Sequence, residues 1–497
     1  MASGGAFLRL LGAGWTLVRN DALLPREAQA FYPGGVGMLA RGLRLFAAQR
    51  AGRPGERLAR ALQTLGPVAI KVGQLLSTRG DIFGPTFAGD LGHLKDRLPP
   101  FPMTQARAEV ERELGRPIDA VFRTFGESVA AASLAQAHDA TLLDGRRVAV
   151  KVLRPGIERR VAAESEVLAL AARLVARWAP LARRLEPVAL AATVIRATEL
   201  ELDLRLEAAG GDELAEVMAA DGYMSAPKVI WDGVGKRCLT LEWAQGMALS
   251  DPQALEQPGL DRKALADNLT RAFLAQALDH GVFHADLHEG NLFAAAPDRI
   301  FAVDFGIIGR LGATERRYLA EILWGFLRRD YIRVAQVHFD AGYVPAHHSV
   351  ASFAQALRAV GEPVFGRVAN AVAMSRVLTQ LFEITALYDM RLRPELVLLQ
   401  KTMMTVEGVA RRIDPEHDIW AAAEPVVKRW IARELSPVTR IRQFAGEAET
   451  AIRNIARLAA PPAVATVAPT KPTSALLWFA LGALAAGATF LAGRLIG

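Results

Sequence analysis

Cysteine is almost absent from this sequence, which has one, Cys238, in 497 residues. A single cysteine excludes an internal disulfide and any zinc site built from several cysteines, and such usage is typical of a reducing compartment. Aromatic residues are also scarce, at 7%, and neither an aromatic RNA-binding motif nor a run of basic residues is present. The net charge of +7 comes largely from arginines spread through Ala/Leu-rich segments, so solvated helix faces explain it better than a nucleic-acid partner.

The sequence also lacks an internal repeat of solenoid period, while its hydrophobic content of 51% is ample for a packed core. Its length suggests two or three packed units. No secretory signal peptide is recognised at the N-terminus, because Arg9 and Arg19 interrupt the apolar residues there. This segment predicts an amphipathic helix, which would lie either on a membrane surface or against the rest of the protein.

Long uncharged runs are missing except near the C-terminus. The stretch from Ala475 to Ala492 carries no charge, and Lys471 and Arg494 flank it. At about 1.5 Å rise per residue it approaches the roughly 30 Å of a bilayer core, so we expect a transmembrane anchor. A buried core helix is the alternative, but a chain end reached through a Pro/Ala/Thr-rich linker has little protein to cover it.

Composition shifts and Pro/Gly breaks predict the organisation of the chain. The expected parts are an N-terminal helical segment at 1–55, a helical extension at 56–117, a lobe with β-strands and inserted helices at 118–250, a helical lobe at 251–458, a linker at 459–474 and the anchor at 475–497.

Turn signals locate the strands of the smaller lobe. Asp144-Gly145 stands between two apolar runs and predicts a hairpin whose second strand is "RRVAVKV". The segment 223–247 predicts another pair of strands, with helices between the two pairs. A small hairpin is also expected around Pro297-Asp298.

Five residues occur in an order and spacing that suit phosphoryl transfer. Lys151 lies in the strand-like "VAVK", where a lysine would face nucleotide phosphates, and Glu207 in a following helix is its candidate partner. Asp286 and Asn291 have the separation of the base Asp and the metal-binding Asn of the kinase catalytic loop. Asp304 begins a D-F-G after a β-run, where it would hold Mg²⁺. This order predicts an α+β, protein-kinase-like bilobal fold.

A metal site is the competing interpretation of "GVFHADLHEGNLF", residues 281–293. Its ligands would be His284, Asp286 and His288. A zinc site needs three or four converging ligands, and no second cluster matches this one. The preferred interpretation is that the histidines brace the loop through hydrogen bonds.

Two common parts of protein kinases are missing. No G-x-G-x-x-G precedes the lysine strand, where the alanine-rich "VAAASLAQAH" (129–138) stands instead. Alanine reaches positive φ less readily than glycine, so contact with phosphates should differ. There is also no A-P-E, and the D-F-G runs almost at once into a predicted helix. Little room remains for an activation segment, which argues against a peptide substrate.

Together these residues resemble the UbiB (ADCK-type) atypical kinase family, from about Gly66 to Asp418. The family's K-x-G-Q stands at 71–74, its E-x-D at 201–203, and "HADLHEGN" and D-F-G complete the set. The resemblance implies a K-x-G-Q helix folded over the nucleotide pocket. The residues expected to contact the nucleotide are Ala130, Ala131, Ala132, Ser133, Lys151, Lys71, Gln74, Glu201, Asp203 and Glu242.

The sequence departs from the family pattern at several positions. Gly210 stands where the family often has asparagine, three residues after Glu207. Leu287 and Glu289 replace common prolines, which bears on the stiffness of the catalytic loop. Bacterial members often end in two transmembrane helices, whereas this sequence predicts one.

The resemblance implies Mg-ATP as cofactor, an ATPase or unorthodox kinase activity, and a role in ubiquinone biosynthesis. Asp286, Lys151 and Glu207 would be catalytic, and Asn291 and Asp304 would hold Mg²⁺. Implied partners are membrane lipids, polyprenyl quinone intermediates and ubiquinone-biosynthesis enzymes, with no nucleic acid; a homodimer is allowed.

The ATP requirement, the missing signal peptide and the expected anchor together predict a single-pass inner-membrane protein with its kinase-like domain on the cytoplasmic side. Two other functions stay open. One is a small-molecule phosphotransferase of the aminoglycoside/choline kinase type, whose catalytic loop is similar. The other is a nucleotide-gated scaffold without enzymatic activity.

Overall fold

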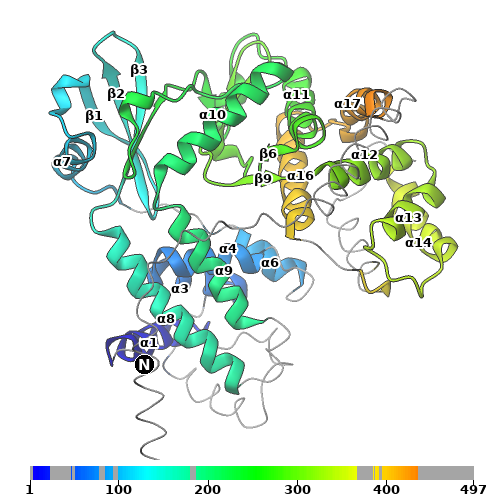
Figure 1. Cartoon of the computed structure of the whole chain (residues 1–497), viewed down its shortest axis with the longest axis horizontal. Coiled ribbons are helices and arrows are strands. Elements are labelled where there is room, and N and C mark those ends of the chain that lie inside the picture. The colour runs from blue at the N-terminus through cyan, green and yellow to red at the C-terminus, as the bar shows by residue number, and fades with distance from the viewer. Residues whose placement is uncertain are drawn as a thin grey trace, which may run out of the picture. The chain divides into compact units, whose positions relative to one another are not determined.

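The structure is a computed structural model that describes residues 4–22, 46, 51–77, 84–92, 94, 99–178, 186–365, 384, 387–390 and 394–434. The chain divides into two compact units, Met1–Ala432 and Arg433–Gly497. The elements that matter for function belong to the first unit, and Figure 1 traces them in chain order.

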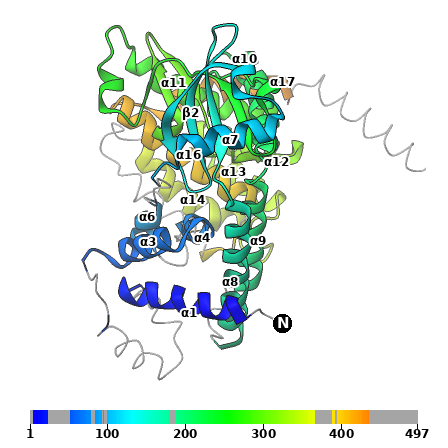
Figure 2. The same cartoon turned by 90° about the vertical axis from the view of Figure 1, so that its left-hand side faces the viewer.

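The first helices of the chain pack on one another and on a later helix pair. They are α1 (Gly4–Arg19), α3 (Pro54–Leu65), α4 (Pro67–Ser77) and α6 (Pro85–Gly92). Three begin with proline, whose fixed φ and missing N–H suit a first helical position. Leu62, Phe87 and Leu91 form a core shared by α3, α4 and α6. Helix α1 contacts α3 and the later α8 (Ile157–Trp178) (Figure 2). The predicted N-terminal helix therefore packs against the protein, although Phe7, Leu8 and Trp15 stay exposed.

A four-stranded antiparallel sheet forms the smaller lobe, in the order β1 (Phe122–Ala131), β2 (Ala135–Leu142), β3 (Arg147–Leu153) and β4 (Cys238–Glu242). The predicted hairpin is confirmed, with Gly145 at φ +91° in its turn. Val148, Val150 and Val152 of β3 are buried with α7 (Met103–Leu114) on one face. Because side chains alternate along a strand, Lys151 points to the opposite face.

Three helices follow the lysine strand, in the part where helices were expected between the two strand pairs: α8, α9 (Pro187–Leu200) and α10 (Leu204–Asp221). Asp203 caps α10 by accepting a hydrogen bond from the backbone N–H of Arg205 at 3.2 Å, and Gly222 ends it at φ +75°. This start places Glu207 in the first turn, where its side chain is buried. Helix α10 contacts both β4 and the first helix of the second lobe, α11 (Arg262–Ala275).

The second lobe is mainly helical. Besides α11 and a π-helical turn at Gln276–His280, it contains short strands in two small sheets, one strand before α11 and four after the turn. These strands are β5 (Met247–Ala248), β6 (Val282–His284), β7 (Leu292–Ala295), β8 (Arg299–Ala302) and β9 (Ile308–Arg310). The helices α12 (Ala313–Leu327), α13 (Tyr331–Asp340), α14 (Val350–Phe365), α16 (Pro394–Ile413) and α17 (Ile419–Glu434) complete it. The β7–β8 pairing confirms the hairpin predicted around Pro297-Asp298.

One local prediction is only half right. Residues 223–247 were expected to form two strands paired with each other, but only β4 forms before the range ends at the first residue of β5, which pairs in another sheet. The first half makes single bridges to two different sheets, from Ser225 to Phe301 and from Val229 to Leu241. Pro227, which has no N–H to donate, stands between these bridges and suits a broken rather than a continuous ladder.

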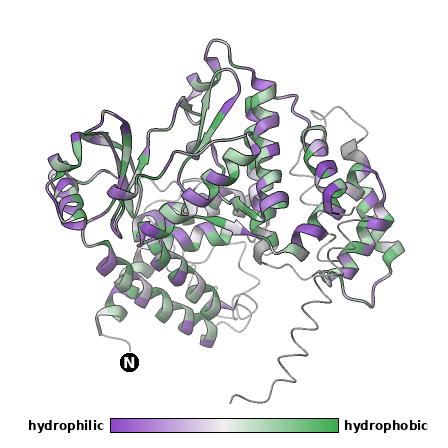
Figure 3. Cartoon of the chain, turned by 45° about the horizontal axis from the view of Figure 1, so that its top comes forward, coloured by the Kyte–Doolittle hydropathy of each residue, from purple (hydrophilic) through white to green (hydrophobic). Residues whose placement is uncertain are grey.

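The transmembrane part of the predicted fold needs correction. No helix among the described residues is long and apolar enough to cross a membrane. The longest of them, α8 and α16, carry charged side chains among their apolar ones, and the coloured helices of Figure 3 mix hydrophilic with hydrophobic residues. This finding contradicts the predicted anchor and, with it, the single-pass inner-membrane placement; residues 459–497 lie outside the described part. The α+β bilobal arrangement itself fits the prediction.

Candidate functional site

Lys151 is the centre of a group of charged side chains that come from elements of both lobes. Its Nζ lies 2.8 and 2.9 Å from the two carboxylate oxygens of Glu207 on α10. The same nitrogen lies 3.2 Å from Oδ1 of Asp304, which follows β8. The predicted Lys–Glu pair is thus formed, and the D-F-G aspartate joins it.

Burial and mutual attraction together shift the pKa values of this group. Burial opposes the charge on Lys151, but Asp304 and Glu207 outweigh burial and raise the lysine pKa. Lys151 in turn holds the pKa of Asp304 well below its ordinary value. Burial raises the pKa of Glu207 to about 7, although Lys151 partly opposes this shift. Lys151 therefore stays charged, and Glu207 titrates close to neutral pH.

A second ion pair joins the K-x-G-Q helix to the same region. Nζ of Lys71, on α4, lies 2.6 Å from Oε1 of Glu201, just after α9. Burial raises the pKa of Glu201, and Lys71 opposes that rise. Asp304 and Lys151 also act electrostatically on Glu201, so the two pairs belong to one charged cluster. Gln74 lies on the same helix, one turn further along.

Two expected nucleotide contacts are engaged with neighbouring arginines. Asp203 accepts from the guanidinium of Arg205 at 2.7 and 2.9 Å, in addition to capping α10. Glu242, at the end of β4, lies 3.6 Å from the guanidinium of Arg146. Both carboxylates are therefore partly neutralised by local ion pairs.

The loop that follows β6 is held by His284. Its buried ring accepts a hydrogen bond at Nδ1 from the backbone N–H of Asp286 (3.1 Å) and donates from Nε2 to the carbonyl of Val303 (3.1 Å). Burial lowers the pKa of His284, which agrees with this neutral form. Both ring nitrogens are used, so His284 braces the loop and has no nitrogen left for a metal. The predicted bracing role fits this geometry.

Asp286 and Asn291 sit at the two ends of this loop. The side-chain amide of Asn291 donates to the carbonyl of Asp286 at 3.1 Å. The carboxylate of Asp286 lies 3.9 Å from Nζ of Lys401 on α16 and 3.7 Å from Nε2 of His288. Leu287, which stands where the family commonly has proline, is fully buried. Its packing can restrain the loop at this position in place of a proline ring.

Asp304 adopts a left-handed backbone conformation, with φ +62°. Aspartate and asparagine tolerate this conformation better than most residues. Phe305 next to it is buried and packs on the ring of His284, with centroids 5.5 Å apart. A Cβ at Gly211 would lie 2.8 Å from the Phe305 ring, and one at Gly210 would meet Ile308. Gly210 thus lies where α10 approaches the D-F-G segment closely.

The alanine-rich segment forms the turn between β1 and β2. Ala130 and Ala131 end β1, and the N–H of Ala132 donates to the carbonyl of Ala135 at 2.8 Å. Ser133 is buried within the turn. Arg154, just beyond β3, donates from Nε to the carbonyl of Ala132 at 2.9 Å. The turn is therefore held by its own backbone hydrogen bond and by the side chain of Arg154.

The side chains gathered here suit a bound magnesium nucleotide. Asn291 accepts at its backbone carbonyl from the N–H of Val303 at 2.9 Å, which places it beside the residue preceding Asp304. With its amide nitrogen engaged, Asn291 has the carboxamide oxygen available. A carboxylate and a carboxamide oxygen are ligands that Mg²⁺ prefers. Lys151 supplies the positive charge that phosphates need.

Several positioning residues were not foreseen from the sequence. Arg154 and Lys401 have no local pattern that distinguishes them from other basic residues. Thr402 donates to the carbonyl of Ala285 at 3.1 Å, and Gln276 accepts from the N–H of His284 at 3.0 Å. These contacts come from α16 and the π-helical turn, so only the tertiary structure reveals them.

A β-strand lysine paired with a helical glutamate, an Asp–Asn loop and a D-F-G aspartate define a protein of the kinase-like class. Comparison with known proteins agrees. Residues 93–338 match the ABC1 atypical kinase-like domain, and residues 357–418 match the UbiB helical domain. The chain belongs to the UbiB family of atypical kinases.

Curated relatives named "Probable protein kinase UbiB" are similar over most of the chain. The protein of Pseudomonas aeruginosa is 40% identical over 80% of this chain and 75% of its own length. That of Marinobacter nauticus is 38% identical over 78% of this chain and 72% of its own. The solved structure of an Rv3197–erythromycin complex from Mycobacterium tuberculosis has a TM-score of 0.50 and 23% identity, covering 79% of this chain and 96% of that one. That likeness concerns the fold alone.

Proposed function

We propose that this protein is an ATP-dependent atypical kinase or ATPase that supports ubiquinone biosynthesis. The observation that carries the proposal is Lys151, whose ammonium group lies between the carboxylates of Glu207 and Asp304. A partly buried, charged lysine beside a D-F-G aspartate has a clear use when phosphates and a divalent cation are bound there. The role in ubiquinone synthesis rests on the name of the similar relatives.

Bound Mg-ATP would supply the phosphoryl group and the charge that the cluster balances. Asp304 and Asn291 would hold the cation, and Lys151 would contact phosphate oxygens while Glu207 keeps it oriented. Asp286, beside Lys401, would orient the attacking hydroxyl or water and accept its proton. The alanine-rich turn from Ala130 to Ser133 would cover the phosphates.

The acceptor is proposed from the family alone. Polyprenyl quinone intermediates and membrane lipids would be the partners, which the protein makes accessible to the enzymes of ubiquinone synthesis. The family resemblance implies that the Lys71–Glu201 pair would lie where a peptide would have to approach the nucleotide, and this favours water or a lipid over a protein substrate.

Replacement of Asp304 by asparagine tests the proposed site. Asparagine tolerates the left-handed backbone at this position, so the variant should fold. We expect loss of the Mg²⁺-dependent thermal shift with ATP, and about a hundredfold slower release of inorganic phosphate. The matched control is Asp119→Asn, because Asp119 is a largely exposed aspartate paired with Arg107. A Mg-ATP shift equal in Asp304→Asn, Asp119→Asn and wild type would refute the site.

A further inference from the structure

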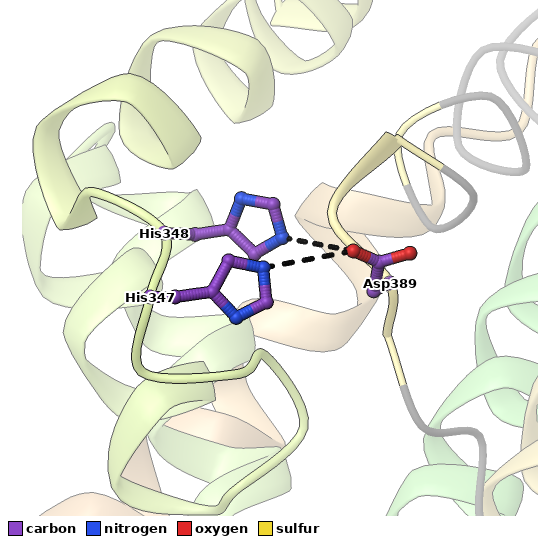
Figure 4. Close-up of side chains that lie close together, drawn as sticks. All are labelled: His347, His348 and Asp389. Atoms are coloured by element: carbon purple, nitrogen blue, oxygen red, sulfur yellow. Dashed lines mark hydrogen bonds and ion pairs between the residues drawn. The ribbon is translucent and has the colours of Figure 1, made fainter.

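Two histidines and an aspartate converge at a place that the proposed function does not use. His347 and His348 lie in the loop between α13 and α14, and Asp389 lies in the turn before α16. Both imidazole Nε2 atoms face Oδ2 of Asp389, at 3.7 Å from His347 and 3.3 Å from His348. The ring centroids are 4.1 Å apart, and Figure 4 shows both rings directed at the carboxylate.

Hydrogen bonding explains only half of this arrangement. His348 is within reach of the carboxylate at 3.3 Å, whereas 3.7 Å is too long for a hydrogen bond from His347. Zinc bonds of about 2.0–2.2 Å in tetrahedral geometry leave neighbouring ligand atoms about 3.4 Å apart. The two nitrogen-to-oxygen distances lie on either side of that value. An ion between the three side chains would account for the position of both rings.

The surrounding residues hold the ligands in place without an ion. Tyr388, next to Asp389, is buried, and its hydroxyl lies 2.9 Å from Oγ of Ser352 on α14. Its ring packs on that of His348 with centroids 5.1 Å apart. Asp389 itself has φ +49°, a conformation that directs the side chain of an aspartate at little cost. The loop and the turn therefore approach each other already packed.

The ligand atoms are accessible from solvent. The side chains of His347 and Asp389 are 66% and 67% exposed, whereas that of His348 is 20% exposed. An incoming cation can reach them and keep water in its remaining coordination positions. Two imidazoles and one carboxylate suit zinc and neighbouring transition metals rather than magnesium or calcium, which prefer oxygen ligands only.

We propose that His347, His348 and Asp389 form a binding site for a divalent transition-metal cation of the zinc type. Among the residues that the structure describes, this is the group of histidine and carboxylate ligands that converges within 4.8 Å. A bound cation joins the loop before α14 to the turn that leads into α16. That helix carries Lys401 and Thr402, which contact Asp286 and the carbonyl of Ala285. The cation therefore restrains the turn before α16, and α16 is the helix whose side chains contact the catalytic loop.

The test uses the full chain without an affinity tag, freed of metal and kept in excess Mg²⁺. Co²⁺ serves as the probe, because its visible absorption reports nitrogen ligands and low coordination number. We expect saturable Co²⁺ absorption that Zn²⁺ displaces. His347→Ala and Asp389→Asn should each weaken Co²⁺ binding about a hundredfold. Asparagine tolerates the backbone of Asp389, so this second variant should fold as the wild type does.

His280 offers a matched control. Its Nε2 lies 3.1 Å from Oδ1 of Asp221, so it forms a histidine–aspartate pair without a second imidazole. His280→Ala should leave Co²⁺ binding unchanged. In hydrogen exchange, Zn²⁺ should slow the amides of residues 387–390 in wild type and His280→Ala, and not in His347→Ala. Equal Co²⁺ affinity in His347→Ala and His280→Ala would overturn the proposal, and would leave the nucleotide site untouched.

Discussion

At the residue scale, Glu207 combines burial with a charged partner. Its side chain is only 9% exposed, yet it accepts two of the three hydrogen bonds that Lys151 donates, the third going to Asp304. Burial raises its pKa from 4.5 to about 7. A proton on Glu207 would remove one charge from the pair, so the orientation of Lys151 depends on pH close to neutrality.

This shift gives the stability of the nucleotide-free protein a characteristic pH dependence. The folded state binds the Glu207 proton more tightly than the unfolded state, so the contribution is complete below pH 4.5 and is lost as pH rises through about 7. Glu207→Gln cannot titrate. We expect wild type to lose stability relative to Glu207→Gln across this window, as the melting temperatures of the two proteins in a pH series will show. Parallel curves would contradict the assigned shift.

Some site residues were predictable from the sequence, and others were not. Lys151, Glu207, Asp286, Asn291 and Asp304 stand in motifs whose spacing follows from the chemistry of phosphate and Mg²⁺, and the structure brings Lys151, Glu207 and Asp304 together. Their roles remain predictions. The group around Asp389 has no such spacing, because its ligands come from segments 41 residues apart that meet only in the packed fold.

At the scale of elements, α10 meets the D-F-G segment through two adjacent glycines. A methyl group at Gly211 would lie 2.8 Å from Cδ2 and 3.2 Å from Cγ of the Phe305 ring. That ring is rigid and buried, so it cannot move aside without disturbing its neighbours. At Gly210 the methyl would overlap Cδ1 of Ile308, the far end of a flexible and partly exposed side chain. Its other neighbours, Cγ1 of Ile308 at 3.6 Å and the carbonyl oxygen of Phe305 at 3.9 Å, are at ordinary contact distance.

The two glycines should therefore respond differently to alanine. Gly210→Ala gains about 1 kcal/mol of helix propensity and should be neutral or stabilising. Gly211→Ala gains the same but crowds Phe305, at a cost of about 1–3 kcal/mol, so a net loss of up to about 2 kcal/mol is expected. Urea unfolding of both variants measures the difference. A Gly211→Ala variant as stable as Gly210→Ala would show that Phe305 relaxes freely.

Elements were predicted best where local turn chemistry decides. Gly145 and the Pro297-Asp298 turn each marked a hairpin that the structure forms. The segment around Pro227 looked like a strand, yet its two ends bridge to different sheets. The prediction of a transmembrane helix was wrong, because no helix among the described residues is long and apolar enough to cross a membrane. A pattern of apolar residues does not say which neighbour an element will have.

At the scale of the whole molecule, Arg154 connects three parts of the chain. Its guanidinium donates to the carbonyl of Ala132 in the alanine-rich turn and to that of Pro99 before α7, each at 2.9 Å. Its own carbonyl accepts from Arg237, just before β4, at 3.1 Å. The turn proposed to cover the phosphates is thus fixed to the outer part of the smaller lobe.

Loosening this connection should speed nucleotide release. Lysine cannot donate in the two directions of the planar guanidinium, so Arg154→Lys loses at least one charge-assisted hydrogen bond. At about 1.5 kcal/mol, this predicts roughly tenfold faster release of a fluorescent ADP analogue in stopped-flow measurements. The control is Arg123→Lys, since Arg123 donates to the carbonyl of Leu143 at the other end of the same sheet. Equal release rates in the two variants would show that the turn moves independently of Arg154.

The short path from the D-F-G to α12 limits how the protein can be switched. After Gly306, residues 308–310 already pair with β6, and α12 begins at Ala313. Many kinases are turned on when a newly added phosphate orders a long segment at this place. Here residues 308–310 are already paired with β6, so a phosphate added at this place would meet an ordered strand. We therefore expect that phosphorylation between the D-F-G and α12 does not switch this protein.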